Sequence, residues 1–219
     1  LDNSAIFKNI CLQNDKSSGY FHKYSKNKLC ANSSFTSFIF PTGLKFNKLD
    51  LEINLEGERS ECNLQSASFL NKNEHQEVKT RVNHLFPNCK SYQKVKNVLT
   101  ADSKGIYQGK IFVKDVAQKT DAYQLSKAIL LSEGSEFDSK PELEIYADDV
   151  KCSHGSTSGS LDKDSVYYLM TRGLSKKEST KLLVNGFLNE VADSIKSESI
   201  KNFIKIKLDN QLLDEYKKH

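Results

Sequence analysis

Apolar and polar residues alternate from Leu44 to about His154, and this period of two constrains the fold more than any other feature. In segment 49–56, four leucine or isoleucine residues alternate with four polar ones, and segments 78–86 and 143–147 repeat the pattern. Successive side chains of a strand point to opposite faces, so the pattern predicts many half-buried strands. Short turns separate them and no helical period intervenes, which predicts an all-β sandwich, barrel or solenoid.

Polar residues at nominally inward positions favour the solenoid among these three folds. Stacked coils can ladder such side chains from one coil to the next. The residues concerned are Asn63, Gln65, Ser66, Ser68 and Thr80. The chain has three prolines, as expected if most strands are flanked by others on both sides. No strict short repeat is visible, so periodicity alone does not prove a β-helix.

The period changes to that of a helix after Gly159. Ser175 and Glu178 form a capping-box pattern, which predicts the start of an amphipathic helix reaching Ile195. A last helix is expected from Ile200 onward. We predict three parts: an irregular N-terminal lead-in over 1–43, a β core over 44–158 and a helical domain over 159–219. Within the lead-in, two short apolar patches (6–7 and 35–40) could pair as strands, without a clear register.

Composition excludes several classes of protein. The 219 residues carry 32 Lys+Arg against 28 Asp+Glu, and the few arginines argue against a nucleic-acid reader. No apolar run approaches the ~20 residues of a membrane span, and there is no secretory signal pattern. The five cysteines are dispersed and odd in number, which indicates free thiols in a reducing compartment. Because the chain starts with Leu1 rather than Met, we expect a processed or trimmed fragment.

Val150, Cys152 and His154 share one face of a predicted strand, with Lys151 and Ser153 on the other. Residues two apart lie about 6.6 Å apart along a strand, so thiol and imidazole reach one surface. Both are suitable ligands for iron or zinc, but two donors do not close a metal site. On spacing alone, a buried cysteine beside a hydrogen-bonded histidine is the favoured interpretation.

Other candidate groups have simpler explanations. His75 and His84 flank Glu77, but their odd separation places them on opposite faces of an unbroken strand. Glu142 and Glu144 share a face and could form a hydrolytic pair, but a strand with a solvated acidic side explains them without an enzyme and is the preferred interpretation. The chain has neither a nucleophile-elbow motif nor a phosphate-binding loop. We therefore predict no catalytic residue.

Four segments together resemble the SufB/SufD family of iron–sulfur cluster assembly proteins. They are the sequences GIYQGKIFV (105–113), AQKTDA (117–122), KPELEIYADDVKCSHG (140–155) and YYLMTRG (167–173). The resemblance is closer to SufD members, because the cysteine-bearing motif of SufB members is not visible. Weaker resemblance reaches back to about Gly57 and forward to the C-terminus.

The resemblance implies a right-handed parallel β-helix followed by a small helical domain. It also implies a non-enzymatic scaffold that works with SufB and the ATPase SufC, and that holds an iron–sulfur cluster transiently, shared with SufB. His154 would lie where the cluster is built, with Cys152 as the neighbouring cysteine. SufC would dock on the helices over about 174–195. The family usually has a long N-terminal segment, which this chain is expected to lack, and often a histidine where this chain has Lys79.

Residues and resemblance converge on the end of the β region. The last coil of a solenoid leaves unpaired N–H and C=O groups, which a partner can pair with. We predict that an interface strand with Val150, Lys151 and Ser153 brings a partner to Cys152 and His154. The predicted docking residues for the ATPase are Leu182, Leu183, Phe187 and Val191.

Two rival functions remain open at this point: a β-solenoid enzyme acting on polysaccharide, and a purely structural interaction module. A homodimer of isolated chains is also expected, through the exposed solenoid edge. The expected location is the cytoplasm, with a plastid-type organelle as the alternative.

Overall fold

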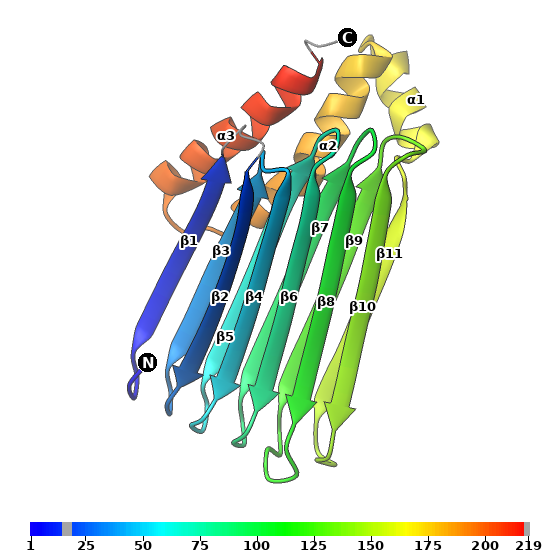
Figure 1. Cartoon of the computed structure of the whole chain (residues 1–219). Helices are drawn as coiled ribbons and strands as arrows, with labels where there is room; N and C mark the ends of the chain where they lie inside the picture. Colours follow the sequence, from blue (N-terminus) through cyan, green and yellow to red (C-terminus); the bar gives the residue numbers. More distant parts are fainter. Residues whose placement is uncertain (15–18, 217–219) are drawn as a thin grey trace.

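The computed structural model describes residues 1–14 and 19–216, and in this part of the chain two parallel β-sheets face each other, followed by helices (Figure 1). The six-stranded sheet, in spatial order, contains β1 (Ile6–Asn14), β3 (Ser34–Thr42), β5 (Glu61–Leu70), β7 (Lys90–Leu99), β9 (Asp121–Leu130) and β11 (Lys151–Ser160). The five-stranded sheet contains β2 (Tyr20–Leu29), β4 (Phe46–Leu55), β6 (His75–His84), β8 (Lys104–Val113) and β10 (Glu136–Ile145). Successive strands alternate between the sheets, so each odd–even pair makes one coil of a β-helix. The predicted fold class is confirmed.

The β-helix begins much earlier than the sequence predicts. Strands β1, β2 and β3 all lie within 1–43, so the predicted irregular lead-in is wrong. The two apolar patches pair directly, with Phe7 beside Phe35 and their rings 5.9 Å apart. The alternation is missing there because β2 ends its sheet and is exposed along most of its length. Without a buried face, selection for a period of two is weak.

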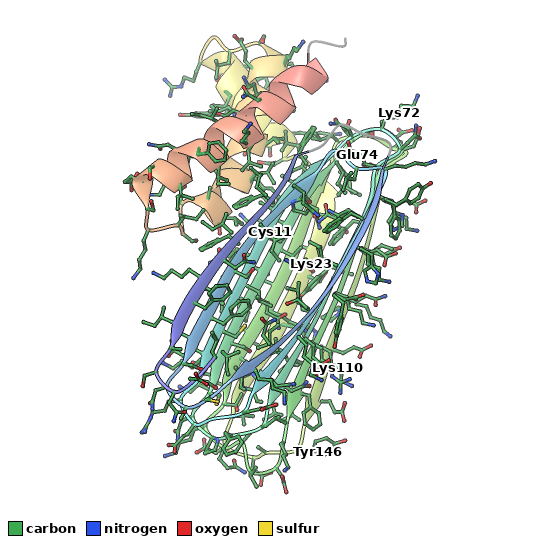
Figure 2. The ribbon with its side chains drawn as sticks, turned by 60° about the vertical axis from the view of Figure 1, so that its left-hand side comes forward. Cys11, Lys23, Lys72, Glu74, Lys110 and Tyr146 are labelled. Atoms are coloured by element: carbon green, nitrogen blue, oxygen red, sulfur yellow. The ribbon has the colours of Figure 1, made fainter. Side chains whose placement is uncertain are left out.

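Polar side chains form ladders inside the β-helix, as predicted for a solenoid. Ser68 bonds Asn97 in the next coil, and Ser126 donates to Ser156 at 2.9 Å. Of the predicted inward residues, Asn63 and Gln65 instead project outward, because inward positions on β5 are the even-numbered ones. Figure 2 shows the N-terminal end of the β-helix, where Cys11 and Lys23 lie between the two sheets of the first coil.

The turns stack as regularly as the strands. Asn32, Asn88 and Lys119 occupy equivalent turns with φ of 57°, 60° and 59°. Asparagine tolerates this left-handed conformation better than most residues. Each amide donates to a carbonyl of the next coil, and the last of these bonds runs 2.6 Å from Lys119 N to Asp149 O. The turn before β11 is therefore held in register by the coil beneath it.

Three helices follow the β-helix: α1 (Lys163–Thr171), α2 (Lys176–Ala192) and α3 (Glu198–Tyr216). The predicted capping box of Ser175 and Glu178 opens α2. Helices α2 and α3 pack on the outer face of the six-stranded sheet, over Ala67, Phe69 and Val98. Figure 1 shows the helices gathered at one end of the strands. Among the described residues, no helix has the length and apolarity needed to cross a bilayer.

A cluster of charged side chains around the buried Lys96 ties α2 to the β-helix. Lys96 is 2% exposed, and its ammonium donates to the Glu190 carboxylate and lies 4.4 Å from the centre of the Phe187 ring. Lys94 adds a second bond to Glu190 at 2.7 Å. The bonds from Lys94 and Lys96 lower the pKa of Glu190 from 4.5 to about 2.

We expect Glu190→Gln to lower the free energy of unfolding by about 1 kcal/mol at neutral pH, a value kept small because the carboxylate is half exposed. The pKa of Glu190 is lower in the folded chain, so its contribution is complete above pH 4.5 and is lost as the pH falls towards 2. Denaturant unfolding of both proteins across this range measures the difference. Glu198→Gln is the control, because Glu198 is highly exposed and its ion pair with Lys201 lies within one surface helix. A difference that stays constant from neutral pH to pH 2 would contradict this assignment.

Candidate functional site

Strand β11 is an unpaired sheet edge. It pairs with β9 on one side, and no described strand lies on the other. Lys151 N donates to Thr120 O at 2.8 Å, so the odd-numbered residues of β11 bond to β9. Backbone groups alternate in direction along a parallel strand, so those of Cys152, His154 and Ser156 point to the free edge. Such an edge is a template for another strand.

The other edge strand at this end, β10, is a poorer template. Glu136 N donates to Ser103 O at 3.0 Å, so the even-numbered residues of β10 bond to β8. The backbone groups of its odd-numbered residues point to the free edge of the sheet. Pro141 is one of these residues and has no N–H to donate. Edge strands are where proline is tolerated in a sheet. Strand β11 therefore offers the more complete set of free donors.

Cys152 and His154 lie on the inward face of β11, which confirms that they share one face of the strand. In register, Cys152 lies beside Ala122 and His154 beside Gln124, both buried. Strand β11 belongs to the last coil, and no further coil of the described chain covers it. The His154 imidazole is therefore exposed although it lies on the inward face. Cys152 is half-buried against the apolar cluster around Val113. Burial, with a further contribution from Asp121, raises the pKa of its thiol, so less of the metal-binding thiolate is present at neutral pH.

The three residues predicted for the interface strand occupy different positions. Val150 lies in the turn before β11 and packs against the apolar cluster that contains Ala147. Lys151 and Ser153 lie on the outer face of β11 and are exposed. A partner strand at this edge would therefore run alongside Lys151 and Ser153, whereas Val150 supports the turn.

The second histidine pair is separated, as its odd spacing predicts. His75 lies on the outer face, 5.0 Å from the Phe46 ring and 3.1 Å from Glu77. His84 is buried in the interior and bonds Ser91 at 2.8 Å. Burial lowers the pKa of His84 to about 4, so this imidazole is neutral at physiological pH. Among the described residues, no three His, Cys, Asp or Glu side chains gather into a metal-binding set.

The predicted docking residues on α2 divide into accessible and inaccessible ones. Leu182 is 53% exposed and Leu183 is half-buried. Phe187 is partly covered by the Lys96 ammonium, and Val191 is fully buried. Val191 is therefore a wrong prediction for a docking surface. The apolar stripe of α2 faces the molecule's own β-helix and α3, which sequence periodicity cannot distinguish from a free face.

A hollow between α1 and α2 places Tyr168 and Leu169, which were not predicted as docking residues, beside the predicted Leu182 and Leu183. It is lined by Asp162, Asp164, Ser165, Tyr168, Leu169, Leu182 and Leu183. No residue of α1 is buried, and Tyr167 and Tyr168 are 69% and 57% exposed. The signal in the sequence is the run YYLM in a short helix, but only the packing shows that it is uncovered. Exposed aromatic clusters of this kind are typical of protein-binding surfaces.

Comparisons with known proteins agree on one family. The model of the SufBD core domain, described as SUF system FeS cluster assembly, matches residues 1–187. The iron–sulfur cluster assembly protein SufD of Escherichia coli is 30% identical over 87% of this chain and 46% of its own length. An iron–sulfur cluster assembly SufBD family protein of Synechocystis is 30% identical over 72% of this chain and 35% of its own length. The chloroplastic protein ABCI7 of Arabidopsis thaliana is 32% identical over 48% of this chain and 22% of its own length.

The match to the family model includes the N-terminal strands, which were predicted as an irregular lead-in. The family model starts at residue 1, which agrees with coils beginning at Ile6 rather than at residue 44. The chain spans less than half the length of each of these three relatives. A family match over most of the chain and a relative of 30% identity lead to one conclusion: the chain belongs to the SufB/SufD family and contains its SufBD core domain.

Proposed function

We propose that this chain is a scaffold subunit on which an iron–sulfur cluster is assembled together with a SufB-type sister chain. The observation that carries the proposal is His154, an exposed imidazole on the inward face of a coil whose edge is unpaired. An inward position is normally covered by the next coil. A sister chain that adds a strand to β11 would provide that cover and enclose His154 in the interface.

The ligand chemistry supports a shared site rather than a site of this chain alone. An imidazole nitrogen is a ligand for iron, and Cys152 is a second donor whose raised thiol pKa disfavours the metal-binding thiolate. Further donors would have to come from the sister, since two do not complete a coordination shell. The cluster is the cargo of this arrangement and passes on after assembly.

We further propose that the hollow between α1 and α2 binds the ATPase SufC. Leu182 and Leu183, both predicted from the sequence, lie there beside Tyr168. ATP hydrolysis would be supplied by that partner, because this chain has no phosphate-binding loop. The cytoplasm or a plastid is the proposed location, since relatives come from bacteria and from a chloroplast. Isolated chains would pair with themselves through the same β11 edge.

The carboxylates of β10 do not favour a polysaccharide-cleaving enzyme. A glycosidase acid needs a raised pKa. Here bonds from Lys140 and Lys110 lower the pKa values of Glu142 and Glu144. Both carboxylates lie on the outer face of β10, on the solvated acidic side that the sequence analysis preferred. A purely structural module is distinguished from the scaffold by the experiment below.

We expect His154→Ala to reduce cluster content about tenfold or more when the complex with sister and ATPase is reconstituted with iron and sulfide, because a first ligand is lost. The visible absorption of the cluster and the bound iron and sulfide measure the effect. His22→Ala, which removes another exposed histidine, on β2, is the matched control. Full cluster content in His154→Ala, with the complex intact, would contradict the proposal and leave a structural module.

A further inference from the structure

Four buried polar side chains form a connected group directly inside the open coil. Tyr107 extends from β8 into the interior and is 1% exposed. Its hydroxyl lies 3.3 Å from Thr80 Oγ1, 3.4 Å from Gln93 Oε1 and 3.5 Å from Gln124 Oε1. Gln93 and Gln124 are 0% and 1% exposed, and neither amide nitrogen has a partner among the described residues. A buried amide without a partner costs stability, so these nitrogens need an explanation.

The chemistry of the Tyr107 hydroxyl explains one of the two unpartnered amide nitrogens. Burial raises the pKa of Tyr107 to about 12, so the group is a hydroxyl with a single proton. It can donate to one glutamine oxygen only, although two lie within reach. The two ends of an amide exchange places by a half-turn of the side chain. If one glutamine is turned, its nitrogen donates to the Tyr107 oxygen, and both bonds are satisfied.

The neighbours of the two glutamines decide which one is turned. Both lie in one inward column, in which Gln93 stands between Leu64 and Gln124. The outer neighbour of Gln124 is His154. An imidazole always has at least one ring N–H to donate, whereas leucine has none. Turning Gln124 therefore places its oxygen at the amide end that has no partner. No hydrogen bond joins this end to His154 as the structure stands, so the bond requires a rotation of the exposed imidazole in the next coil.

The backbone opposite is shaped for this arrangement. A Cβ at Gly109 would lie 2.4 Å from Gln124 Oε1 and 2.4 Å from the Tyr107 hydroxyl oxygen. Any other residue at position 109 would displace both groups. The space that Gly109 leaves is thus filled by the hydroxyl and by the amide that it holds.

We propose that Gln124 is a positioning residue for His154: its amide oxygen accepts the proton of one ring nitrogen and leaves the other nitrogen bare for a metal. Metal-binding imidazoles almost always donate their second N–H to such an acceptor, which fixes the tautomer and the orientation of the ring. The metal-binding consequence rests on the proposed function, whereas the tautomer itself does not.

The ring nitrogens of His154 test this in the isolated chain. Their 15N chemical shifts report the tautomer, and the spectra are recorded at a pH about two units above the ordinary imidazole pKa. His154→Asn identifies the signals. Gln124→Met removes the acceptor at similar volume, and Gln124→Glu restores an acceptor. Gln93→Met is the matched control, since it removes the other amide at Tyr107 without touching the neighbour of His154.

We expect one dominant tautomer in the parent chain, in Gln124→Glu and in Gln93→Met, and a mixture in Gln124→Met. In the reconstituted complex, Gln124→Met should lower cluster content about tenfold and Gln124→Glu should restore it. A mixture in the parent chain, or the same loss of preference in Gln93→Met, would overturn the proposal. If the tautomer is fixed but His154→Ala assembles clusters normally, the proposed function fails and the positioning role stands.

Discussion

Ser156→Pro should abolish pairing of this chain with its sister while leaving the isolated chain folded. Ser156 is on β11, and its backbone N–H points to the free edge rather than to β9. Proline removes that donor and places a ring where the incoming strand must lie, whereas no backbone bond to β9 is lost. Size-exclusion chromatography of the mixed chains measures pairing. We expect the affinity to fall at least about thirtyfold, as is typical when a contact at the centre of an interface is lost.

The side chain of Ser156 must be separated from its backbone in this test. Ser126 donates to the Ser156 hydroxyl at 2.9 Å, a bond that contributes about 1 kcal/mol to the stability of the last coil. Ser156→Ala removes this bond and keeps the N–H, so it should pair normally. If Ser156→Pro pairs as tightly as Ser156→Ala, the sister does not add a strand to β11, and the interface must be sought elsewhere.

The fold could be predicted from the sequence where one face of each strand is buried. Strands β4 and β6 show a clear period of two because their inward faces are covered by coils on both sides. Strand β2 shows no such period, since it ends its sheet and most of its residues are exposed to solvent. In β5 and β7 the period is lost for the opposite reason: α2 and α3 cover Ala67 and Val98 on the outer face, so inward and outward residues are both buried.

The candidate site could be predicted in part. Spacing alone places Cys152 and His154 on one face, and the resemblance supplies their significance. Neither could show that the inward face is open at the last coil, because exposure depends on a coil that is absent from the described chain. Gln124 was missed for a related reason: it becomes a neighbour of His154 only through the register of β9 and β11, thirty positions apart in the sequence.

Leu182→Asp should prevent co-purification of the ATPase without unfolding the chain. Leu182 is 53% exposed and lines the hollow between α1 and α2, so a charge there remains hydrated in the isolated chain and changes stability by less than about 0.5 kcal/mol. In a complex, the same carboxylate would be buried against an apolar partner surface without a counter-ion, at a cost of several kcal/mol.

The choice of variants makes this test decisive. Val191→Asp would also abolish binding, but by burying a charge between α2 and α3 and unfolding the helical domain. Ile206→Asp is the appropriate control, because Ile206 is 58% exposed on α3 and does not line the hollow. Pull-down of the ATPase with each tagged variant measures binding, and thermal unfolding measures stability. Together they distinguish a variant that has lost the docking surface from one that has unfolded. Binding that survives Leu182→Asp but not Ile206→Asp would move the docking surface from the α1–α2 hollow to the outer face of α3.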